Sequence, residues 1–220
     1  MQRKVIERFI DGITDIDIHR YGEYLESIRP ADFEGLFRRF IFAYCSIQTS
    51  WQMNVKLYEM LKSNEWRTDE AELMALLVSS RAGFHNNRTR YLADFAKKFW
   101  DDPYFFLKKW YESWTVYRDR IVKRMLGMGL AKVSFTLEMA YPSDAQVVCL
   151  DRHMLRVYKR KQDKHNSCGA ALYREFERHW CKCCKARGVP PTIARWIYWD
   201  RIQGQKDSRY WAHVLEEVNA

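Results

Sequence analysis

The sequence has few residues that interrupt helices, with nine glycines and five prolines in 220 residues. Few stretches alternate apolar and polar residues with the period of two that marks a half-buried strand. Apolar residues instead recur three and four positions apart, as on one face of an α-helix. This spacing occurs in five stretches: 33–44, 73–77, 91–99, 121–140 with a short break, and 193–202. The last follows Pro190–Pro191, a pair that suits a first helical turn. The pattern predicts an all-α fold.

Long apolar runs are also missing. No segment approaches the ~18 to 20 consecutive apolar residues that cross a bilayer. The segment Met1–Phe9 carries charges too early and too often for a secretory signal. We therefore expect a cytoplasmic protein with reduced thiols and no membrane partner. We also expect a monomer.

The six cysteines lack the paired spacing of a structural zinc site. Cys181, Cys183 and Cys184 read Cys-x-Cys-Cys, whereas zinc sites usually contain Cys-x-x-Cys pairs. Cys168, His165 and His179 lie nearby in the sequence. The spacing favours buried thiols on a helix, and we expect no metal and no cofactor.

Acidic residues are outnumbered, 28 against 37 Lys and Arg, which gives a formal charge of +9. Such an excess favours a polyanionic partner, most commonly nucleic acid. A hydrophobic share of 47% supplies a core and excludes a disordered chain. Six basic residues flank 125–130 and are candidates for phosphate contacts or for a solvated face: Lys108, Lys109, Arg118, Arg120, Lys123 and Arg124.

Two glycines one residue apart, Gly127 and Gly129, separate two helical stretches. Glycine adopts backbone angles that other residues resist, and the first N–H groups of the following helix lack intrahelical partners. Those N–H groups suit a phosphate oxygen. Any tight turn between helices can also use Gly-x-Gly, so the pattern alone leaves both interpretations open.

Asp151 follows apolar residues and precedes the helical pattern Arg152–Arg156. By itself this arrangement is typical of an N-cap. A helix-Gly-x-Gly-helix, a loop and then apolar-Asp-x-His-apolar-x-Arg together resemble the helix-hairpin-helix DNA glycosylase superfamily. Endonuclease III-like and adenine glycosylase-like members are the most similar.

Two further segments carry the resemblance. Ser46-Ile47-Gln48 looks like the family's Ser-x-Gln junction, whose glutamine enters the duplex where the flipped nucleotide was. Gly83–Thr89 is similar to a Gly-aromatic-x-Asn-x-Lys-Ala segment. The resemblance covers about residues 33–160. It implies one unit over 1–220, with a lobe at about 33–140 that ends in the DNA-binding hairpin, a second lobe of 1–32 plus 141–220, and a cleft between them.

The sequence departs from the family in two places. Members with lyase activity carry a lysine two residues after the second hairpin glycine, where this chain has Ala131. Lys132 lies one step further, about 100° around the helix, so it reaches the pocket only if the hairpin register shifts, and otherwise meets phosphate or solvent. The segment from Trp199 through Gly204 to Trp211 lacks the cysteines of the family's iron–sulfur loop.

The resemblance implies base flipping and hydrolysis. Asp151 is then the carboxylate that stabilises positive charge on the deoxyribose and orients or deprotonates water attacking C1′. Without a placed lysine, the product is an intact abasic site, as for a monofunctional DNA glycosylase. The DNA-binding candidates are Gln48, Asn87, Arg88, Lys123, Arg124, Gly127, Gly129, Ala131 and Lys132. Candidates for the walls of the base pocket are Trp51, Trp196, Trp199 and His153, although tryptophans equally build cores.

Two other interpretations stay open. Some phage proteins that resemble this fold build hypermodified thymines, displacing pyrophosphate from activated 5-hydroxymethyluracil with an amine or amino acid. In such a transferase, acting in the cytoplasm of a host cell, Asp151 activates the amine and basic residues bind pyrophosphate. The other interpretation is a protein that recognises distorted DNA without catalysis, against which the presence of Asp151 argues.

Overall fold

The computed structural model describes residues 3–63, 65–158 and 169–203. Over these ranges the regular secondary structure is helical and no strand occurs, which confirms the all-α prediction. None of the described helices is both long enough and apolar enough to cross a bilayer. His165, Cys168 and the segment 204–211 lie outside the described residues.

The helices follow one another with short connections. Their bounds are α1 Arg3–Asp11, α2 Asp15–Ser27, α3 Phe33–Cys45, α4 Trp51–Leu61, η1 Glu65–Thr68, α5 Glu70–Ser80, α6 His85–Asp101, η2 Pro103–Phe106, α7 Trp114–Arg124, α8 Leu130–Ala140, α9 Arg152–Val157, α10 Ala170–Arg187 and α11 Pro191–Gln203. α11 begins at the second proline of the Pro190–Pro191 pair, so this start signal is confirmed.

The chain divides into two compact units. Among the described residues, unit 1 contains 3–29 and those from 137 onward, and unit 2 contains 30–136. The family resemblance implies the corresponding borders at about 32/33 and 140/141. The border at 136/137 falls within α8, so the first part of that helix belongs to unit 2 and its last residues to unit 1.

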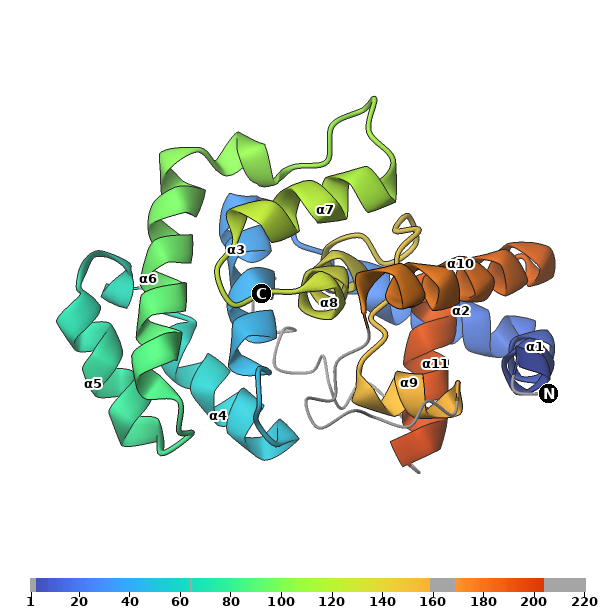
Figure 1. The fold of residues 1–220 in the computed structure, drawn as a ribbon, viewed down its shortest axis with the longest axis horizontal. Helices are drawn as coiled ribbons and strands as arrows, with labels where there is room; N and C mark the ends of the chain where they lie inside the picture. Colours follow the sequence, from blue (N-terminus) through green and yellow to red (C-terminus); the bar gives the residue numbers. More distant parts are fainter. Residues whose placement is uncertain (1–2, 64, 159–168, 204–220) are drawn as a thin grey trace. The chain divides into compact units, whose positions relative to one another are not determined.

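Unit 2 is built around α3, which contacts α4 and α6 (Figure 1). Asp32 caps this helix by accepting a hydrogen bond of 2.7 Å from the N–H of Gly35. Nearly every residue from Gly35 to Cys45 is buried, because neighbouring helices cover several of its faces. Phe37 stacks on Phe95 of α6 at 5.1 Å between ring centroids. Burying each such ring contributes about 2 to 3 kcal/mol, so the core of unit 2 is an aromatic cluster between α3 and α6.

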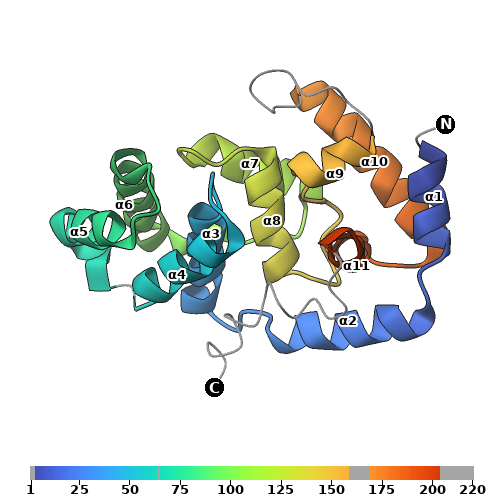
Figure 2. The same ribbon diagram turned by 90° about the horizontal axis from the view of Figure 1, so that it is seen from below.

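Unit 1 joins the two ends of the described chain. α1 packs on α10, and α11 contacts both α2 and α10 (Figure 2). The hydroxyl of Tyr21 on α2 donates to the buried carboxylate of Asp200 on α11. Trp180 and Trp196 are almost fully buried. Large aromatic side chains therefore fill this core too.

The turn between α7 and α8 requires glycine at one position. Gly127 has φ of +74°, in the left-handed region. A Cβ atom placed there lies 2.3 Å from Cδ2 of Tyr91, whereas a Cβ at Gly129 meets no heavy atom within 4 Å. The hydroxyl of Tyr44 donates to the carbonyl of Leu126 at 2.8 Å. Tyr44 of α3 and Tyr91 of α6 therefore hold the turn against these two helices.

We predict that Gly127→Ala destabilises the protein by about 1 to 3 kcal/mol, because alanine is strained at this φ and its methyl group displaces Tyr91. Urea unfolding followed by circular dichroism measures the loss. Gly129→Ala is the matched control and should cost less than about 1 kcal/mol. Equal losses in the two variants would contradict the assignment of the constraint to Gly127.

Candidate active site

The hairpin presents a positively polarised edge in unit 2. The N–H groups of Leu130, Ala131 and Lys132 form the first turn of α8, where intrahelical acceptors are missing and the helix dipole is positive. Lys123 and Arg124, at the end of α7, are exposed. Both also line a hollow of about 500 Å³ with Phe105, Val116, Asp119 and Arg120. The edge can accept an anion from solvent.

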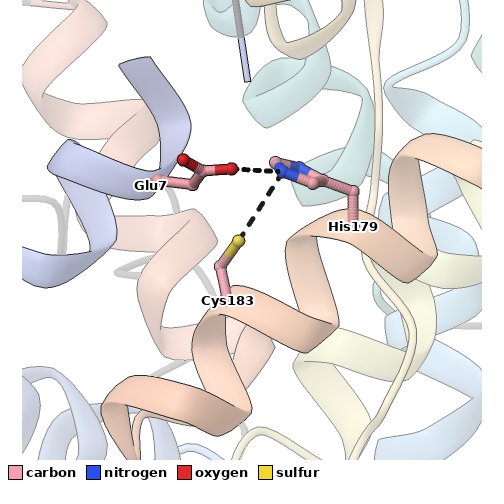
Figure 3. A group of neighbouring side chains, drawn as sticks. All are labelled: Glu7, His179 and Cys183. Atoms are coloured by element: carbon pink, nitrogen blue, oxygen red, sulfur yellow. Dashed lines mark hydrogen bonds and ion pairs between the residues drawn. The ribbon is translucent and has the colours of Figure 1, made fainter. Parts of the chain in front are cut away.

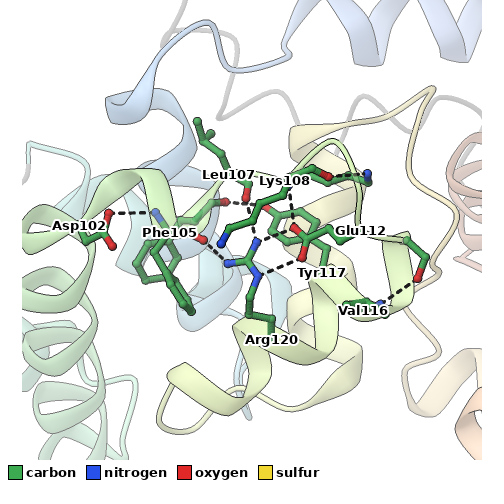
Figure 4. Close-up of polar contacts among 11 residues, drawn as sticks. Asp102, Phe105, Leu107, Lys108, Glu112, Val116, Tyr117 and Arg120 are labelled. Atoms are coloured by element: carbon green, nitrogen blue, oxygen red, sulfur yellow. Dashed lines mark hydrogen bonds and ion pairs between the residues drawn. The ribbon is translucent and has the colours of Figure 1, made fainter.

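Two of the other basic residues near the hairpin serve the protein itself. The guanidinium of Arg120 binds Glu112 through both of its carboxylate oxygens, at 2.6 and 3.1 Å, and donates to the carbonyls of Phe105 and Leu107 (Figure 4). Arg118 is fully buried and donates to Ser134 Oγ at 3.4 Å. Neither guanidinium presents a solvated phosphate-binding face, so among the basic residues of α7 between Arg118 and Arg124 the exposed charges are those of Lys123 and Arg124.

Lys132 makes a contact that the sequence did not predict. Its Nζ donates to the carbonyl and the hydroxyl of Ser46, at 3.1 and 2.7 Å, and lies 5.8 Å from the centroid of the Phe135 ring. The side chain is half-buried. Ser46 follows the last residue of α3 and precedes Gln48 by two positions. The amine therefore supports the segment that carries Gln48.

The sequence predicts that Arg88 binds DNA, but the structure places this residue in the interior. Only 3% of it is exposed. Its Nη1 donates to the carbonyls of Tyr44 and Cys45 at 3.1 and 3.3 Å, and its Nη2 donates to the carbonyl of Ile47. The last carbonyls of a helix have no intrahelical partners, and the guanidinium satisfies those of α3. Its Nε also donates to the carbonyl of Gly83 at 3.3 Å, so this buried guanidinium is bound to four carbonyls and is not available to a phosphate.

Gln48 lies on the short loop that Arg88 and Lys132 hold. The residue is exposed and has φ of +51°, which is unusual for a side chain other than glycine. Thr49 Oγ1 donates to the carbonyl of Cys45 at 2.7 Å. Strained backbone of this kind persists where the surroundings fix it, often at functional sites. Gln48 is thus a solvent-facing side chain on a constrained loop.

Asn87 and Trp51 lie on other parts of unit 2. Asn87 is half-buried in the first turn of α6, just after Gly83 and Phe84, which both have positive φ. Trp51 is the half-buried first residue of α4, whose cap is Ser50. Both residues are thus partly accessible to solvent.

Asp151 belongs to unit 1, where it caps α9. Its Oδ1 accepts hydrogen bonds from the N–H groups of His153 and Met154, at 2.9 and 3.0 Å, so the N-cap interpretation is confirmed. Oδ2 takes no part in the cap. The residue is half-buried. A cap leaves one carboxylate oxygen available for chemistry, so the structural and chemical roles are compatible.

Buried side chains hold the backbone that leads to Asp151. Residues 147–150 are buried without regular secondary structure, so their N–H groups need partners. Three consecutive N–H groups each bind a side chain: Val148 to Glu177 Oε1 at 3.0 Å, Cys149 to Glu138 Oε1 at 2.7 Å, and Leu150 to the Tyr173 hydroxyl at 3.1 Å. The Tyr173 hydroxyl in turn donates to the carbonyl of Val148. These contacts fix the position of Asp151.

The buried carboxylate of Glu138 is paired. Arg195 of α11 donates to Glu138 Oε2 through Nε, at 2.9 Å, and through Nη2. Burial raises the pKa of Glu138, and Arg195 opposes this shift. Burial lowers the pKa of Arg195, but the carboxylates of Glu138 and, more weakly, Asp151 bring it above its ordinary value. We assign Glu138 as ionised, because its two oxygens accept hydrogen bonds from a guanidinium and a backbone N–H.

The structure brings together two of the predicted pocket residues. The rings of His153 and Trp199 meet edge to face, with centroids 4.9 Å apart. Burial lowers the pKa of His153, so its imidazole is neutral near pH 7. Trp196 is 1% exposed and belongs to the core of unit 1, which corrects its assignment to a pocket wall.

Sequence patterns missed the residues that position Asp151. Glu138 gives a signal that could have been used. It is a carboxylate in the mostly apolar stretch Phe135–Ala140, and acidic residues are rarely buried without a partner. Tyr173, Glu177 and Arg195 give no comparable signal, since each lies in a helix of mixed composition.

Comparisons with known proteins agree on a family. The family model described as 8-oxoguanine DNA glycosylase matches residues 18–189. A search of curated protein sequences gives no match.

Solved structures share the fold at low sequence identity. The 8-oxoguanine DNA glycosylase of Methanocaldococcus jannaschii is 18% identical, with a TM-score of 0.73 over 92% of this chain and 94% of that one. The 8-oxoguanine DNA glycosylase of Thermotoga maritima is 19% identical, with a TM-score of 0.71 over 93% and 97%. A Methanocaldococcus jannaschii 8-oxoguanine glycosylase/lyase in complex with a 15mer DNA containing 8-oxoguanine is 18% identical, with a TM-score of 0.74 over 92% and 97%.

These comparisons confirm the helix-hairpin-helix glycosylase resemblance that the sequence motifs carry. The family model covers most of the chain, from within α2 to just before α11. The chain therefore belongs to the 8-oxoguanine DNA glycosylase family, within the helix-hairpin-helix superfamily of DNA glycosylases.

Proposed function

We propose that the protein is a monofunctional DNA glycosylase. It flips a modified nucleotide, with 8-oxoguanine as the first candidate, out of duplex DNA and hydrolyses the N-glycosidic bond with Asp151 as the key carboxylate. Membership of the family supports the reaction and the candidate base. The observation that carries the monofunctional assignment is the engagement of Lys132 with Ser46. The monomeric state and the cytoplasmic location remain predictions from the sequence.

The hairpin is the proposed binding site for the DNA backbone. A phosphate oxygen accepts hydrogen bonds from N–H groups at Gly127, Gly129 and Ala131, and the positive end of the α8 dipole adds attraction. Lys123 and Arg124 are exposed beside this turn and contribute charge. Such contacts position the duplex without reading its sequence.

Gln48 is the proposed side chain that fills the gap left by the flipped nucleotide. Extruding a nucleotide costs a few kcal/mol of stacking and pairing. The side chain that fills the gap must therefore be held rigidly in place. The contacts of Arg88 and Lys132 with the 44–47 backbone supply that rigidity. Trp199 and His153 in unit 1 and, separately, Trp51 in unit 2 are proposed as aromatic contacts of the extruded base, since a flipped base favours aromatic partners.

The chemistry at Asp151 needs a carboxylate and a water molecule. As the C1′–N bond breaks, its electron pair leaves with the base and positive charge develops on the deoxyribose, which the carboxylate stabilises. Water then attacks C1′, and Asp151 accepts the proton that the water loses. The departing base takes up a proton, so that the products are free base and an abasic site. Oδ2, outside the α9 cap, is the oxygen proposed to act.

A lyase step needs an amine nucleophile that points at C1′ and is deprotonated. Ala131 stands at the position where relatives with lyase activity carry lysine, and the amine of Lys132 donates to two oxygens of Ser46. An amine committed to these hydrogen bonds is a poor nucleophile. The strand therefore stays intact after base release.

The direct test uses labelled duplexes that carry 8-oxoguanine, uracil, an alkylated purine or 5-hydroxymethyluracil. We expect strand cleavage of at least one of them, 8-oxoguanine first, only after heating in alkali, because alkali cuts abasic sites. Cleavage without alkali would contradict the monofunctional assignment. Tight binding of the duplexes with no base release would instead identify a protein that recognises distorted DNA.

A transferase on the same fold is the second candidate. Alanine at position 131, in place of the lysine of lyase-type relatives, removes lyase chemistry. The carboxylate of Asp151 remains and can activate an incoming amine. Nucleoside mass spectrometry after incubation of DNA bearing pyrophosphorylated 5-hydroxymethyluracil with amino acids tests this. A new amino-acid-linked nucleoside, without abasic sites in the duplex panel, would replace the glycosylase assignment.

We predict that Asp151→Asn lowers the rate of base release at least about a thousandfold, from loss of nucleophile activation and charge stabilisation, while DNA affinity stays within about threefold. Asparagine also caps helices, so α9 should remain folded. Single-turnover kinetics and fluorescence anisotropy give the two quantities.

Asp69→Asn is the matched control, because Asp69 caps α5 through the same pair of contacts, to the N–H groups of Ala71 and Glu72. This variant should release base at the wild-type rate. Full activity of Asp151→Asn, or equal losses in both variants, would remove Asp151 from the mechanism.

A further inference from the structure

Three potential metal ligands converge in unit 1, on a face that the proposed glycosylase chemistry does not use. His179 and Cys183 lie one turn apart on α10, and Glu7 faces them from α1 (Figure 3). Glu7 Oε1 is 3.3 Å from His179 Nε2, and Cys183 Sγ is 3.7 Å from the same nitrogen. The three ligand atoms lie within 4.8 Å of one another.

These distances match the edges of a tetrahedral zinc site. Bonds of about 2.0 Å to nitrogen and oxygen and about 2.3 Å to sulfur place the nitrogen about 3.3 Å from oxygen and about 3.6 Å from sulfur. The two contacts to Nε2 already have these lengths. A small rotation of the Glu7 side chain, which is 46% exposed, brings its oxygen and the sulfur to a similar separation.

The tautomer of His179 points a lone pair at the group. Its Nδ1 lies 3.3 Å from the Tyr158 hydroxyl, and that hydroxyl donates to the carbonyl of Phe176. The hydroxyl oxygen is therefore placed to accept a hydrogen bond from Nδ1–H, which leaves Nε2 as the ring nitrogen that faces Glu7 and Cys183. Metal-binding histidines are oriented by such a hydrogen bond on the opposite nitrogen.

A proton relay does not explain the arrangement. In a nucleophile–histidine–carboxylate triad, the carboxylate and the nucleophile bind opposite nitrogens of the ring. Here Glu7 and Cys183 both approach Nε2. All three ligand atoms converge within 4.8 Å of one another, so a cation placed among them can bind all three. A thiolate and a carboxylate also balance the charge of a divalent ion.

The group can be reached from solvent on the side of Glu7. Glu7 is half-exposed at the rim, while 10% of the His179 side chain is exposed, so an ion can enter from solvent. Asp11 follows Glu7 by one turn of α1 and lies near enough to act on the Cys183 thiol electrostatically. Asp11 or a water molecule can complete the coordination.

We propose that Glu7, His179 and Cys183 bind one divalent cation that favours sulfur and nitrogen ligands, with Zn²⁺ as the best fit, and that this ion ties α1 to α10. The ion is structural and lies outside the glycosylase chemistry. The sequence spacing predicts no metal because it compares only cysteines and histidines that are close in the chain, whereas Glu7 is 172 residues from His179.

Cobalt titration of the purified full chain tests the site, because Co²⁺ bound by a thiolate absorbs in the near ultraviolet through sulfur-to-metal charge transfer. We expect a saturating band at about one Co²⁺ per chain, displaced by Zn²⁺. Zn²⁺ should also raise the melting temperature, and a chelator should reverse the rise.

Variants assign the ligands. Cys183→Ser should abolish the charge-transfer band, and Glu7→Gln, a change at a half-exposed side chain, should weaken Co²⁺ binding at least about tenfold. Cys181→Ser is the matched control, because Cys181 lies on the same helix but contacts the carbonyl of Gln146 instead, and it should bind as the wild type does. Circular dichroism checks that each variant is folded.

Absence of a charge-transfer band in the wild-type protein would overturn the proposal, as would an unchanged band in Cys183→Ser. The group would then be only a polar contact that joins α1 to α10. Base release by the glycosylase is a separate readout, so failure of the metal site leaves the proposed function untouched.

Discussion

The position of Asp151 depends on one constraint, the need to satisfy the backbone N–H groups of a buried stretch without regular structure. Each unpaired buried N–H group costs about 1 to 3 kcal/mol. Glu177, Glu138 and Tyr173 each satisfy one of the three groups before Asp151. Burying Glu138 would itself be costly, and Arg195 offsets that cost with a buried ion pair. Helices α8, α10 and α11 are thereby linked through the segment that carries the catalytic candidate.

The same principle organises the Gln48 loop in unit 2. The carbonyls at the end of α3 need donors, and Arg88 and Lys132 supply them. Both residues look like DNA ligands or nucleophiles in the sequence because they are cations beside family motifs. Their charges are used inside the protein instead. Arg88 and Lys132 therefore stabilise the loop that carries Gln48 and do not add to the positive charge that faces DNA.

Local patterns predicted the features that depend on near neighbours in the chain. Helical spacing indicated the all-α fold, Gly127 the hairpin turn, and Asp151 a helix cap with a possible second role. Roles set by distant partners were not predictable: Lys132 and Ser46 are 86 residues apart, and Arg88 and Ile47 are 41 apart. Tryptophan is equally ambiguous, because Trp196 in the core and Trp199 beside His153 lie on the same helix.

In the proposed reaction Asp151 acts without an amine nucleophile, because Lys132 donates to Ser46. Borohydride reduction of the enzyme on a duplex carrying its substrate base measures this directly, since it converts a Schiff base into a stable covalent complex. We predict abasic sites but no covalent protein–DNA complex. A trapped complex that disappears in Lys132→Gln would contradict this prediction and make Lys132 the nucleophile.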